Sequence, residues 1–322
     1  TGSEPRPASI EAACRWLEDR AAVKTWLARP ELDLRRQLQN GGGICRIAGL
    51  LPGKVAEGVR EVLEHLSESE WERAGEGHRD DAGYADRVQH RFGILEVEHH
   101  EVLLGVARLL AEMMPGLLPN FSAARYSAHD HIAPHDDLVP ESYTAREVQM
   151  TRAAYSNGSL KDAVRAWKRA NAAEEVGEVV DASSNALEEA LQAGDLAAVK
   201  RAVEAGARSS AADDGDREIP FTRMVAAAFY FTRDWKTDFG GEFVDIQDKK
   251  RYVPEFNTLV AFEVPRMHEV TAVTAPAGRA RHSIFGWWLL DDEAVKPSRS
   301  KRRGIKRPAA AASASGPPLS VG

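Results

Sequence analysis

The chain has 322 residues, of which 43% are hydrophobic and 28% are charged, with 25 glycines, 16 prolines and 2 cysteines. This composition excludes a disordered chain, a collagen-like repeat and a disulfide scaffold, and the length suffices for about two ordinary domains. The net charge is −7, yet seven basic and no acidic residues lie between Lys296 and Arg307. We therefore expect an acidic body followed by a basic tail.

Cysteine content and apolar runs bear on the cellular compartment. Cys14 and Cys45 are the two cysteines, and the start of the sequence has no apolar core of a secretory signal. These features favour unbridged thiols in a reducing, intracellular compartment, either cytoplasmic or nuclear. The longest strongly apolar run, 224–231, is far shorter than the roughly 20 residues of a membrane span, so we expect no contact with a membrane.

The first third of the chain predicts helices. Apolar residues recur at helical spacing from Ser9, the expected N-cap, to about Ala28. Residues 44–51 read as a short strand. The ranges 53–67 and 97–113 predict two further helices, the second closed by a Pro-Gly pair.

Short β-like runs dominate the sequence after Pro119. Glycine, proline and asparagine separate them, which is typical of an antiparallel sandwich or barrel. The predicted strands are 121–127, 131–137, 224–231, 241–246, 258–264, 268–273 and 282–290. The order of elements predicts an α+β fold, with helices packed against a β-core.

A segment of about 85 residues with little β character, 138–222, divides these strands. Within it, 185–207 resembles a single ankyrin-type helix pair. One such unit cannot bury its faces by stacking on copies of itself, so we interpret it as an inserted helical hairpin that packs on the β-core.

Five regions follow from these patterns. They are an N-terminal helical extension (1–39), a first part of the core domain (40–137), a helical insertion (138–222), a second part of the core (223–293) and a flexible Pro/Ala/Ser-rich basic tail (294–322). The basic cluster of the tail fits a nuclear-import signal or a nucleic-acid contact as well as it fits a solvated charge run.

The candidate chemistry begins with histidines. In an extended strand, residues two apart share a face, so His135 and Asp137 project together while Asp136 points away. With His268, from another predicted strand, they make two imidazoles and one carboxylate, a set that leaves coordination positions open on Fe(II). His129 and His131 form an alternative metal-binding pair.

A candidate anion site follows downstream. Alternation along the strand 282–290 and the residue before it places Arg281 and Ser283 on one face and His282 on the other. A guanidinium beside a hydroxyl suits bidentate capture of a carboxylate.

Four blocks carry a family resemblance. YSAHDHIAPHDD (126–137), RMVAAAFYFTRDWKTDFGGEF (223–243), NTLVAFEVPRMHEVTAV (257–273) and RHSIFGWW (281–288) resemble successive core strands of the Fe(II)/2-oxoglutarate-dependent oxygenases. They are most similar to the prolyl 4-hydroxylase-like branch, especially the group that hydroxylates a ribosomal-protein proline. The likeness covers about 40–290 without the insertion, and it implies a double-stranded β-helix (jelly-roll) core flanked by N-terminal helices.

The resemblance also implies a cofactor set. His135, Asp137 and His268 would bind Fe(II), which uses 2-oxoglutarate and O2 as co-substrates, with ascorbate as a candidate reductant. Oxidative decarboxylation of 2-oxoglutarate to succinate and CO2 would accompany hydroxylation of a substrate C–H bond. Because Asp137 is present, hydroxylation is preferred over halogenation.

By matching position, Arg281 would pair with the distal carboxylate of 2-oxoglutarate, assisted by Tyr230 and Ser283. Tyr126 matches an aromatic position of the family, and we interpret it as a core aromatic beside the site. The turn 240–241 is interpreted as structural.

Three functions remain open on the sequence. The first is hydroxylation of a prolyl residue in a protein or peptide, and the second is hydroxylation of a specialised metabolite or a free amino acid. The third is a nuclear interaction protein with a degenerate oxygenase core, whose basic tail contacts nucleic acid. The chain departs from the resembled group at His129, lacks that group's second domain, and carries its insertion directly after the His-Asp-Asp block.

Overall fold

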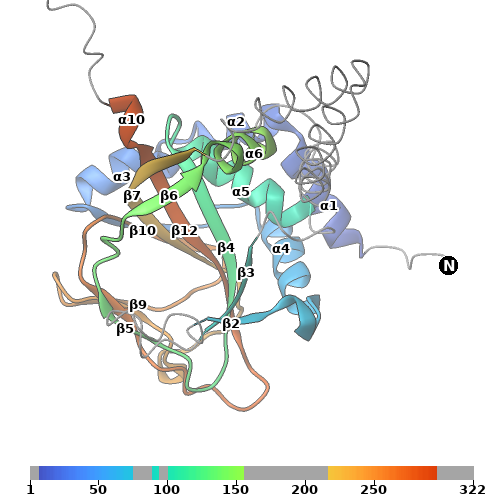
Figure 1. The fold of residues 1–322 in the computed structure, drawn as a ribbon. Coiled ribbons are helices and arrows are strands. Elements are labelled where there is room, and N and C mark those ends of the chain that lie inside the picture. Colours follow the sequence, from blue (N-terminus) through green and yellow to red (C-terminus); the bar gives the residue numbers. More distant parts are fainter. Residues whose placement is uncertain (1–6, 75–88, 94–100, 156–216, 296–322) are drawn as a thin grey trace, which may run out of the picture.

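The computed structural model describes residues 7–74, 89–93, 101–155 and 217–295 (Figure 1). These residues form two antiparallel sheets and a layer of helices, in the double-stranded β-helix arrangement that the sequence predicts. In the described part, the larger sheet has the order β1-β10-β7-β12-β4-β3-β2, with β6 paired to β7. The smaller sheet has the order β5-β11-β8-β9.

The strands of the larger sheet are β1 (Ile44–Ala48), β2 (Glu72–Ala74), β3 (Gln89–Gly93), β4 (Leu118–Tyr126), β6 (Glu141–Thr144), β7 (Glu218–Tyr230), β10 (Thr258–Glu263) and β12 (Arg281–Asp291). Those of the smaller sheet are β5 (Ile132–His135), β8 (Phe243–Asp245), β9 (Lys250–Tyr252) and β11 (His268–Val270). The helices are α1 (Ala8–Glu18), α2 (Arg20–Leu27), α3 (Leu34–Asn40), α4 (Gly53–His65), α5 (Glu101–Met113), α6 (Ala145–Tyr155) and α10 (Asp292–Val295). Short 3-10 turns lie at Pro30–Leu32, Glu68–Glu70 and Thr237–Phe239.

The main hydrophobic core lies between the larger sheet and helices that include α1, α4 and α5, which lie together on one side of the sheet in Figure 1. Helix α4 contributes one apolar stripe, whereas α5 is buried on nearly every side because it lies among α1, α4 and β4. Trp288 of β12 is fully buried, and its indole N–H donates to the carbonyl of Leu110 at 3.0 Å. The helices therefore fix one face of the sheet and leave its other face for the smaller sheet.

The N-terminal helix differs from the prediction. A single helix was expected up to Ala28, but the chain forms α1 and α2, separated at Asp19. The Asp19 carboxylate accepts hydrogen bonds from the backbone N–H groups of Ala21 and Ala22, so it caps a new helix. Ser9 lies inside α1 rather than at its N-cap, and its hydroxyl donates to Glu61 instead.

The expectation of little β character in 138–222 is wrong at both ends of that segment. Strand β6 and helix α6 follow residue 140, and β7 begins at Glu218 rather than near residue 224. β6 has four residues and pairs with the first part of β7, with Glu141 opposite Phe221. Such a short strand gives almost no alternation to detect.

Several predictions fall outside the described residues. The ankyrin-like pair at 185–207 and the basic tail from residue 296 are among them, and the division into five regions stays a prediction. The short strands β2, β3 and β9 and the helix α3 were not expected from the sequence.

The two cysteines are free, as expected. Burial raises the pKa of the Cys45 thiol to about 12, so this group behaves as a small apolar side chain rather than as a nucleophile. Among the helices that the structure describes, none has the length and apolar character needed to cross a bilayer.

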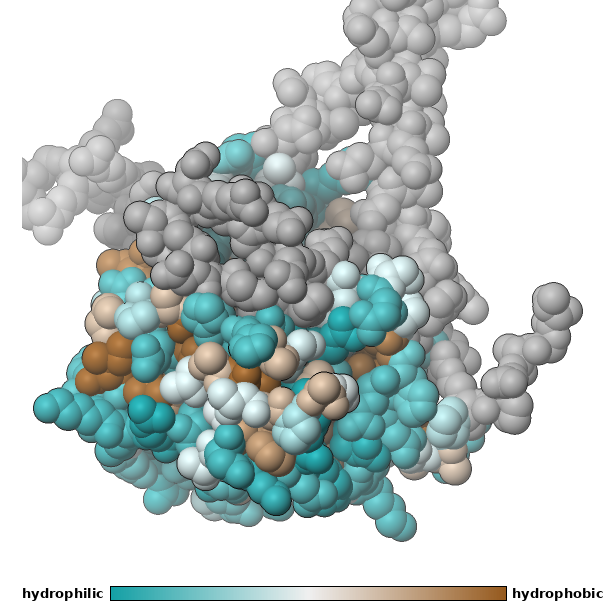
Figure 2. Space-filling view, turned by 90° about the horizontal axis from the view of Figure 1, so that it is seen from below, coloured by the Kyte–Doolittle hydropathy of each residue, from teal (hydrophilic) through white to brown (hydrophobic). Residues whose placement is uncertain are grey.

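The face in Figure 2 is largely hydrophilic where the structure describes it, with apolar residues in small groups between polar ones. Large hydrophobic side chains are exposed at few described positions, namely Leu138, Met224, Ile246 and Met267. The apolar residues of the body are thus mostly used in its cores.

Close contact between α1 and α4 depends on Gly58, because a Cβ there would lie 2.5 Å from the Ser9 carbonyl oxygen and 2.6 Å from Ala13 Cβ. We expect Gly58→Ala to lower the free energy of unfolding by about 1–3 kcal/mol, the usual range for overpacking, despite alanine's better helix propensity. Gly53→Ala is the matched control, since nothing lies within 4 Å of its added Cβ. Chemical denaturation of both variants measures the difference, and equal stabilities would contradict the packing argument.

Candidate active site

Strand pairing brings the two predicted histidines together. β11 lies between β5 and β8, and its residue His268 stands directly opposite His135 of β5. The two imidazole rings have their centroids 4.1 Å apart. Residues far apart in the sequence are therefore joined by one register of an antiparallel ladder.

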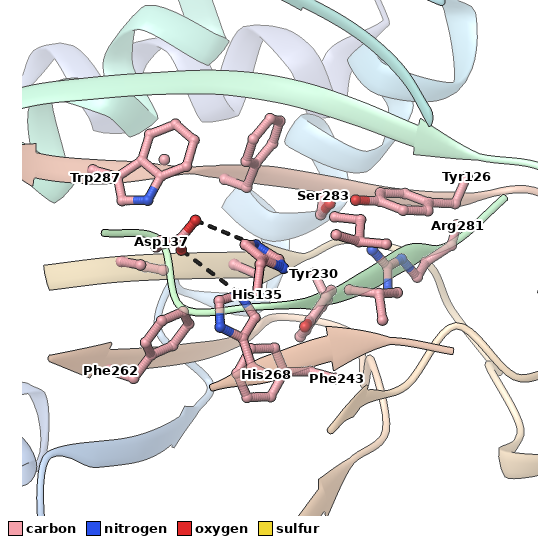
Figure 3. A pocket seen from close by; sticks show the side chains of 17 residues that line it. Tyr126, His135, Asp137, Tyr230, Phe243, Phe262, His268, Arg281, Ser283 and Trp287 are labelled. Carbon is pink, nitrogen blue, oxygen red and sulfur yellow. Dashed lines mark ion pairs between the residues drawn. The ribbon is translucent and has the colours of Figure 1, made fainter. Parts of the chain in front are cut away.

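Asp137 reaches the same point from a turn. β5 ends at His135, and Asp137 has φ of 63°, so the expected continuous strand through residue 137 is wrong in detail. The turn nonetheless places Asp137 Oδ1 3.3 Å from His135 Nε2, and Oδ2 3.6 Å from His268 Nε2 (Figure 3). Asp136 does not share this direction, and its carboxylate accepts from the backbone N–H of Leu138.

Each histidine is oriented by its second ring nitrogen. His135 Nδ1 donates to the Ala133 carbonyl at 2.9 Å, and His268 Nδ1 donates to the Arg266 carbonyl at 2.7 Å. This fixes the tautomer and directs both Nε2 atoms toward Asp137, an arrangement common for metal-binding histidines. The His268 ring also stacks on Phe243, with 5.1 Å between centroids.

The Asp137 carboxyl group is ionised in this setting. Burial alone would raise its pKa, but the hydrogen bond with His135 and the nearby His268 and Arg223 lower the pKa to about 2. In the described part of the chain, His135, Asp137 and His268 are the one group of three potential metal ligands, with donor atoms within 4.8 Å of one another. Two imidazole nitrogens and one carboxylate oxygen can hold a divalent iron and leave coordination positions open.

The alternative pair does not join this group. His131 Nδ1 donates to the backbone carbonyl of His129, and neither side chain belongs to a set of three potential ligands among the described residues. His129 has φ of 77° and occupies an exposed turn before β5.

A second cluster lies at the other end of the same cavity. Arg281, Ser283 and Tyr230 line it, and Ser283 stands opposite Tyr230 in the pairing of β12 with β7. Figure 3 shows Arg281 and Tyr126 at one end of the cavity and Asp137 at the other, with the two histidines between them. The predicted alternation on β12 is confirmed, since His282 packs on the opposite side against Trp71.

The Arg281 guanidinium is buried without a counter-charge. Its side chain is 2% exposed, and no ion pair joins it to an acidic group in the described ranges. Nη1 donates to the Gly241 carbonyl, the ring of Tyr126 lies 3.9 Å from the guanidinium carbon, and Nε has no hydrogen-bond partner. A buried cation with an unused donor is costly unless a ligand completes it, and a carboxylate matches its geometry.

Tyr230 lies beside this cation. Burial raises the pKa of the Tyr230 hydroxyl, an effect that the charge of Arg281 opposes without reversing it. The phenol is therefore protonated at neutral pH and can donate a hydrogen bond to an anion in the cavity.

Some residues of the cavity were not predicted. Arg223 contacts Asp137, and Phe243, Phe262 and Trp287 form apolar walls around the metal cluster. Buried arginines and aromatic residues inside strands give no distinctive sequence signal, so only the fold identifies them. Gly241 was interpreted as purely structural, but its carbonyl also holds Arg281.

Comparisons with known proteins agree with this geometry. Residues 205–289 match the model of the 2OG-Fe(II) oxygenase superfamily. The chain carries a 2OG-Fe(II) oxygenase domain. The matched range includes His268, Tyr230, Arg281 and Ser283. In a separate comparison, no curated protein matches the chain by sequence.

The chain also resembles solved structures. A prolyl hydroxylase from Trichoplax adhaerens, solved with a peptide fragment of the hypoxia inducible factor oxygen degradation domain, is 13% identical. The alignment covers 87% of this chain and 97% of that one, with a TM-score of 0.50. A prolyl-4-hydroxylase from Pseudomonas putida is 14% identical, with 79% and 97% covered and a TM-score of 0.44. The first likeness establishes a common fold at low identity.

Proteins of the matched superfamily use Fe(II), 2-oxoglutarate and O2, and the match over residues 205–289 indicates a dioxygenase of this type. The residues present fit this cofactor set, because two histidines with an ionised Asp137, and an arginine without an acidic partner among the described residues, line one cavity. The recognition made from four sequence blocks is therefore confirmed at the level of the superfamily.

Burial gives His282 a role in the pH dependence of stability. Desolvation, followed by the charge of Arg125, lowers the pKa of His282 to about 4 from 6.5. Below pH 6.5, His282 binds a proton in the unfolded chain but stays neutral in the native state. The free energy of unfolding therefore falls as the pH drops toward 4, by about 3 kcal/mol in total. We expect His282→Phe, which keeps an aromatic ring on Trp71, to flatten this part of the profile.

Urea denaturation at several pH values measures the effect. His65→Gln, at the exposed end of α4, is the control variant and should keep the wild-type slope. An unchanged slope in His282→Phe would show that other groups govern this pH range.

Proposed function

We propose that the oxygenase hydroxylates a C–H bond of a prolyl residue in a protein or peptide, with His135, Asp137 and His268 as the iron ligands. The observation that carries this proposal is the convergence of these ligands at one end of a cavity whose other end holds Arg281. The overall reaction converts substrate C–H, 2-oxoglutarate and O2 into substrate C–OH, succinate and CO2.

Each residue then has a defined task. Fe(II), when bound, supplies the place where 2-oxoglutarate and O2 react. The hydrogen bonds from Nδ1 to backbone carbonyls keep the Nε2 atoms of His135 and His268 directed at the metal position. Asp137 supplies one negative charge.

The far end of the cavity binds the co-substrate. Arg281 offers the unused Nε donor and a buried positive charge to the distal carboxylate of 2-oxoglutarate. Tyr230 and Ser283 face the same space and donate hydroxyl groups to that carboxylate. Tyr126 lies against the guanidinium face, where its ring favours the cation and limits its movement.

Two lines support a protein or peptide substrate. The four sequence blocks resemble the prolyl 4-hydroxylase-like branch, and the Trichoplax adhaerens structure of the same fold holds a peptide.

Three further features belong to the same proposal. They are ascorbate as the reductant, a nuclear or cytoplasmic location of the protein, and a contact of the basic tail with nucleic acid.

Mass spectrometry of two substrate panels tests the substrate class. Proline-containing peptides and free amino acids are each incubated with the enzyme, Fe(II), ascorbate and 2-oxoglutarate, and the gain of one oxygen atom is monitored. We expect the gain on a prolyl residue of a peptide. Oxygen incorporated into a free amino acid alone would replace this proposal with a small-molecule hydroxylase.

The ligand assignment predicts that His135→Ala and Asp137→Ala each abolish decarboxylation of 2-oxoglutarate, since two ligands hold the metal poorly. Succinate release measures this loss, and circular dichroism checks the fold. His131→Ala is the matched control, because His131 precedes the cluster without joining it. Retained turnover in the first two variants, or its loss in the control, would contradict the assignment.

The co-substrate assignment predicts that Arg281→Lys raises the apparent KM for 2-oxoglutarate by about 10- to 100-fold, because a point charge cannot form the two parallel hydrogen bonds of a guanidinium. Arg279→Lys is the control. Arg279 lies two residues earlier on the chain and donates to the backbone carbonyls of Arg233 and Asp234 rather than lining the cavity. Equal KM values in the two variants would place the anion site elsewhere.

A further inference from the structure

Arg223 links the metal cluster to β6. Its side chain is 9% exposed, and Nη1 lies 3.5 Å from both Asp137 Oδ1 and the Asp137 carbonyl oxygen. On the other side, Nε donates to Glu141 Oε1 at 2.7 Å. The guanidinium carbon also lies 3.8 Å from the ring centroid of Trp287, which closes that end of the cavity.

The contact continues away from the cavity. The Tyr143 hydroxyl donates a hydrogen bond to Glu141 Oε2 at 2.9 Å. The oxygen of the same Tyr143 hydroxyl accepts a hydrogen bond from Asn120 Nδ2 at 2.6 Å. A polar chain thus runs from β4 through β6 and β7 to Asp137. Such networks restrict the orientation of their members when every member has a partner.

Asp137 needs this kind of support. It lies in a turn beyond the end of β5, so no ladder pairing holds it as the ladder holds His135 and His268. Arg223 also separates the Asp137 carboxylate from that of Glu141. Without the guanidinium, the buried Asp137 carboxylate and the partly exposed Glu141 carboxylate would lose the cation between them.

We propose that Arg223 is a positioning residue that holds the Asp137 carboxylate in its metal-binding orientation, with Glu141 as its anchor on β6. This inference rests on the proposed role of Asp137 as an iron ligand.

Positioning and simple charge effects make opposite predictions. A cation beside a metal site weakens metal binding by repulsion, so its removal in Arg223→Met would tighten binding if charge were its only contribution. Arg223→Lys would then change little, because the charge stays. If Arg223 orients Asp137, both variants weaken metal binding, since neither keeps the planar fork that reaches Asp137 and Glu141 together.

The experiment is a titration of the metal-free full-length chain with Co(II), followed by the visible absorption of the bound ion. This readout reports affinity and coordination geometry without turnover. Arg233→Met is the matched control. Arg233 also pairs with a glutamate, Glu57, and lies 4.1 Å from an aromatic ring, that of Phe256, but it does not contact the metal cluster.

We expect the Kd for Co(II) to rise at least about tenfold in Arg223→Met and severalfold in Arg223→Lys, each with an altered spectrum, while Arg233→Met binds as wild type. Glu141→Gln should weaken binding less, because a neutral acceptor remains for the guanidinium. Unchanged or tighter binding in the Arg223 variants would overturn the proposal. If Arg223→Met does not fold, Arg223→Lys and Glu141→Gln test the proposal alone: weaker Co(II) binding in both supports it, and unchanged or tighter binding overturns it.

Asp137→Ala distinguishes failure of this inference from failure of the proposed function. If Asp137→Ala binds Co(II) as wild type does, the ligand assignment itself is wrong, and the role of Arg223 fails with it. If Asp137→Ala loses binding while the Arg223 variants keep it, the ligand assignment stands and the positioning role alone is overturned.

Discussion

The site depends on the pairing of β5 with β11, which sets His135 opposite His268. A slip of one residue in this register would turn one imidazole to the other face of the sheet, because side chains alternate along a strand. The register is secured from outside the pair. β11 also pairs with β8, where His268 stands opposite the fully buried Asp245, and Asp245 accepts two hydrogen bonds from Arg266, two residues before His268. The ion pair thus fixes the approach of β11 to the cluster, and the backbone carbonyl of Arg266 orients the His268 ring.

The Arg281 end of the cavity follows from a different constraint, the long ladder formed by β12 with β4 and β7. This ladder presents Arg281 and Ser283 to the cavity and His282 to the helical side, so one strand serves both the site and the packing. Burying the Arg281 guanidinium without a partner carboxylate among the described residues lowers the stability of the fold. The same burial favours ligand binding, since a carboxylate ligand would supply the counter-charge and accept a hydrogen bond from Nε. The helices stabilise the sheet sufficiently to hold such a group in place.

Sequence patterns predicted the parts of the fold whose periodicity is strong. The strand containing Arg281, the end of the long strand before Trp235 and the helix around Val59 were expected close to where they lie, and seven of the residues that line the cavity were named in advance. The failures have physical causes. Asp19 interrupts the first helix by capping a second one, a competition that hydrophobic spacing does not report. Strand β6 is too short to alternate, and Asp137 owes its position to a left-handed turn rather than to the strand that was expected to carry it. Arg223 could not be identified because its role arises only when β6 and β7 pair.

Charge balance connects the two ends of the cavity. Arg223 is paired with Glu141, so among the residues that the structure describes the remaining fixed charges that face the cavity are the ionised Asp137 and the guanidinium of Arg281. These two charges cancel each other, and a divalent iron in the cluster would leave the cavity with two positive charges. Uncompensated charge in a buried space is costly, so such a site favours a ligand that carries two negative charges, one near each end. 2-Oxoglutarate is a dianion of that kind, and the proposed assignment sets one carboxylate at the metal end and one at Arg281. The pairing of Arg223 with Glu141 is part of this balance, because either residue alone would shift the net charge by one unit and weaken the match to a dianion.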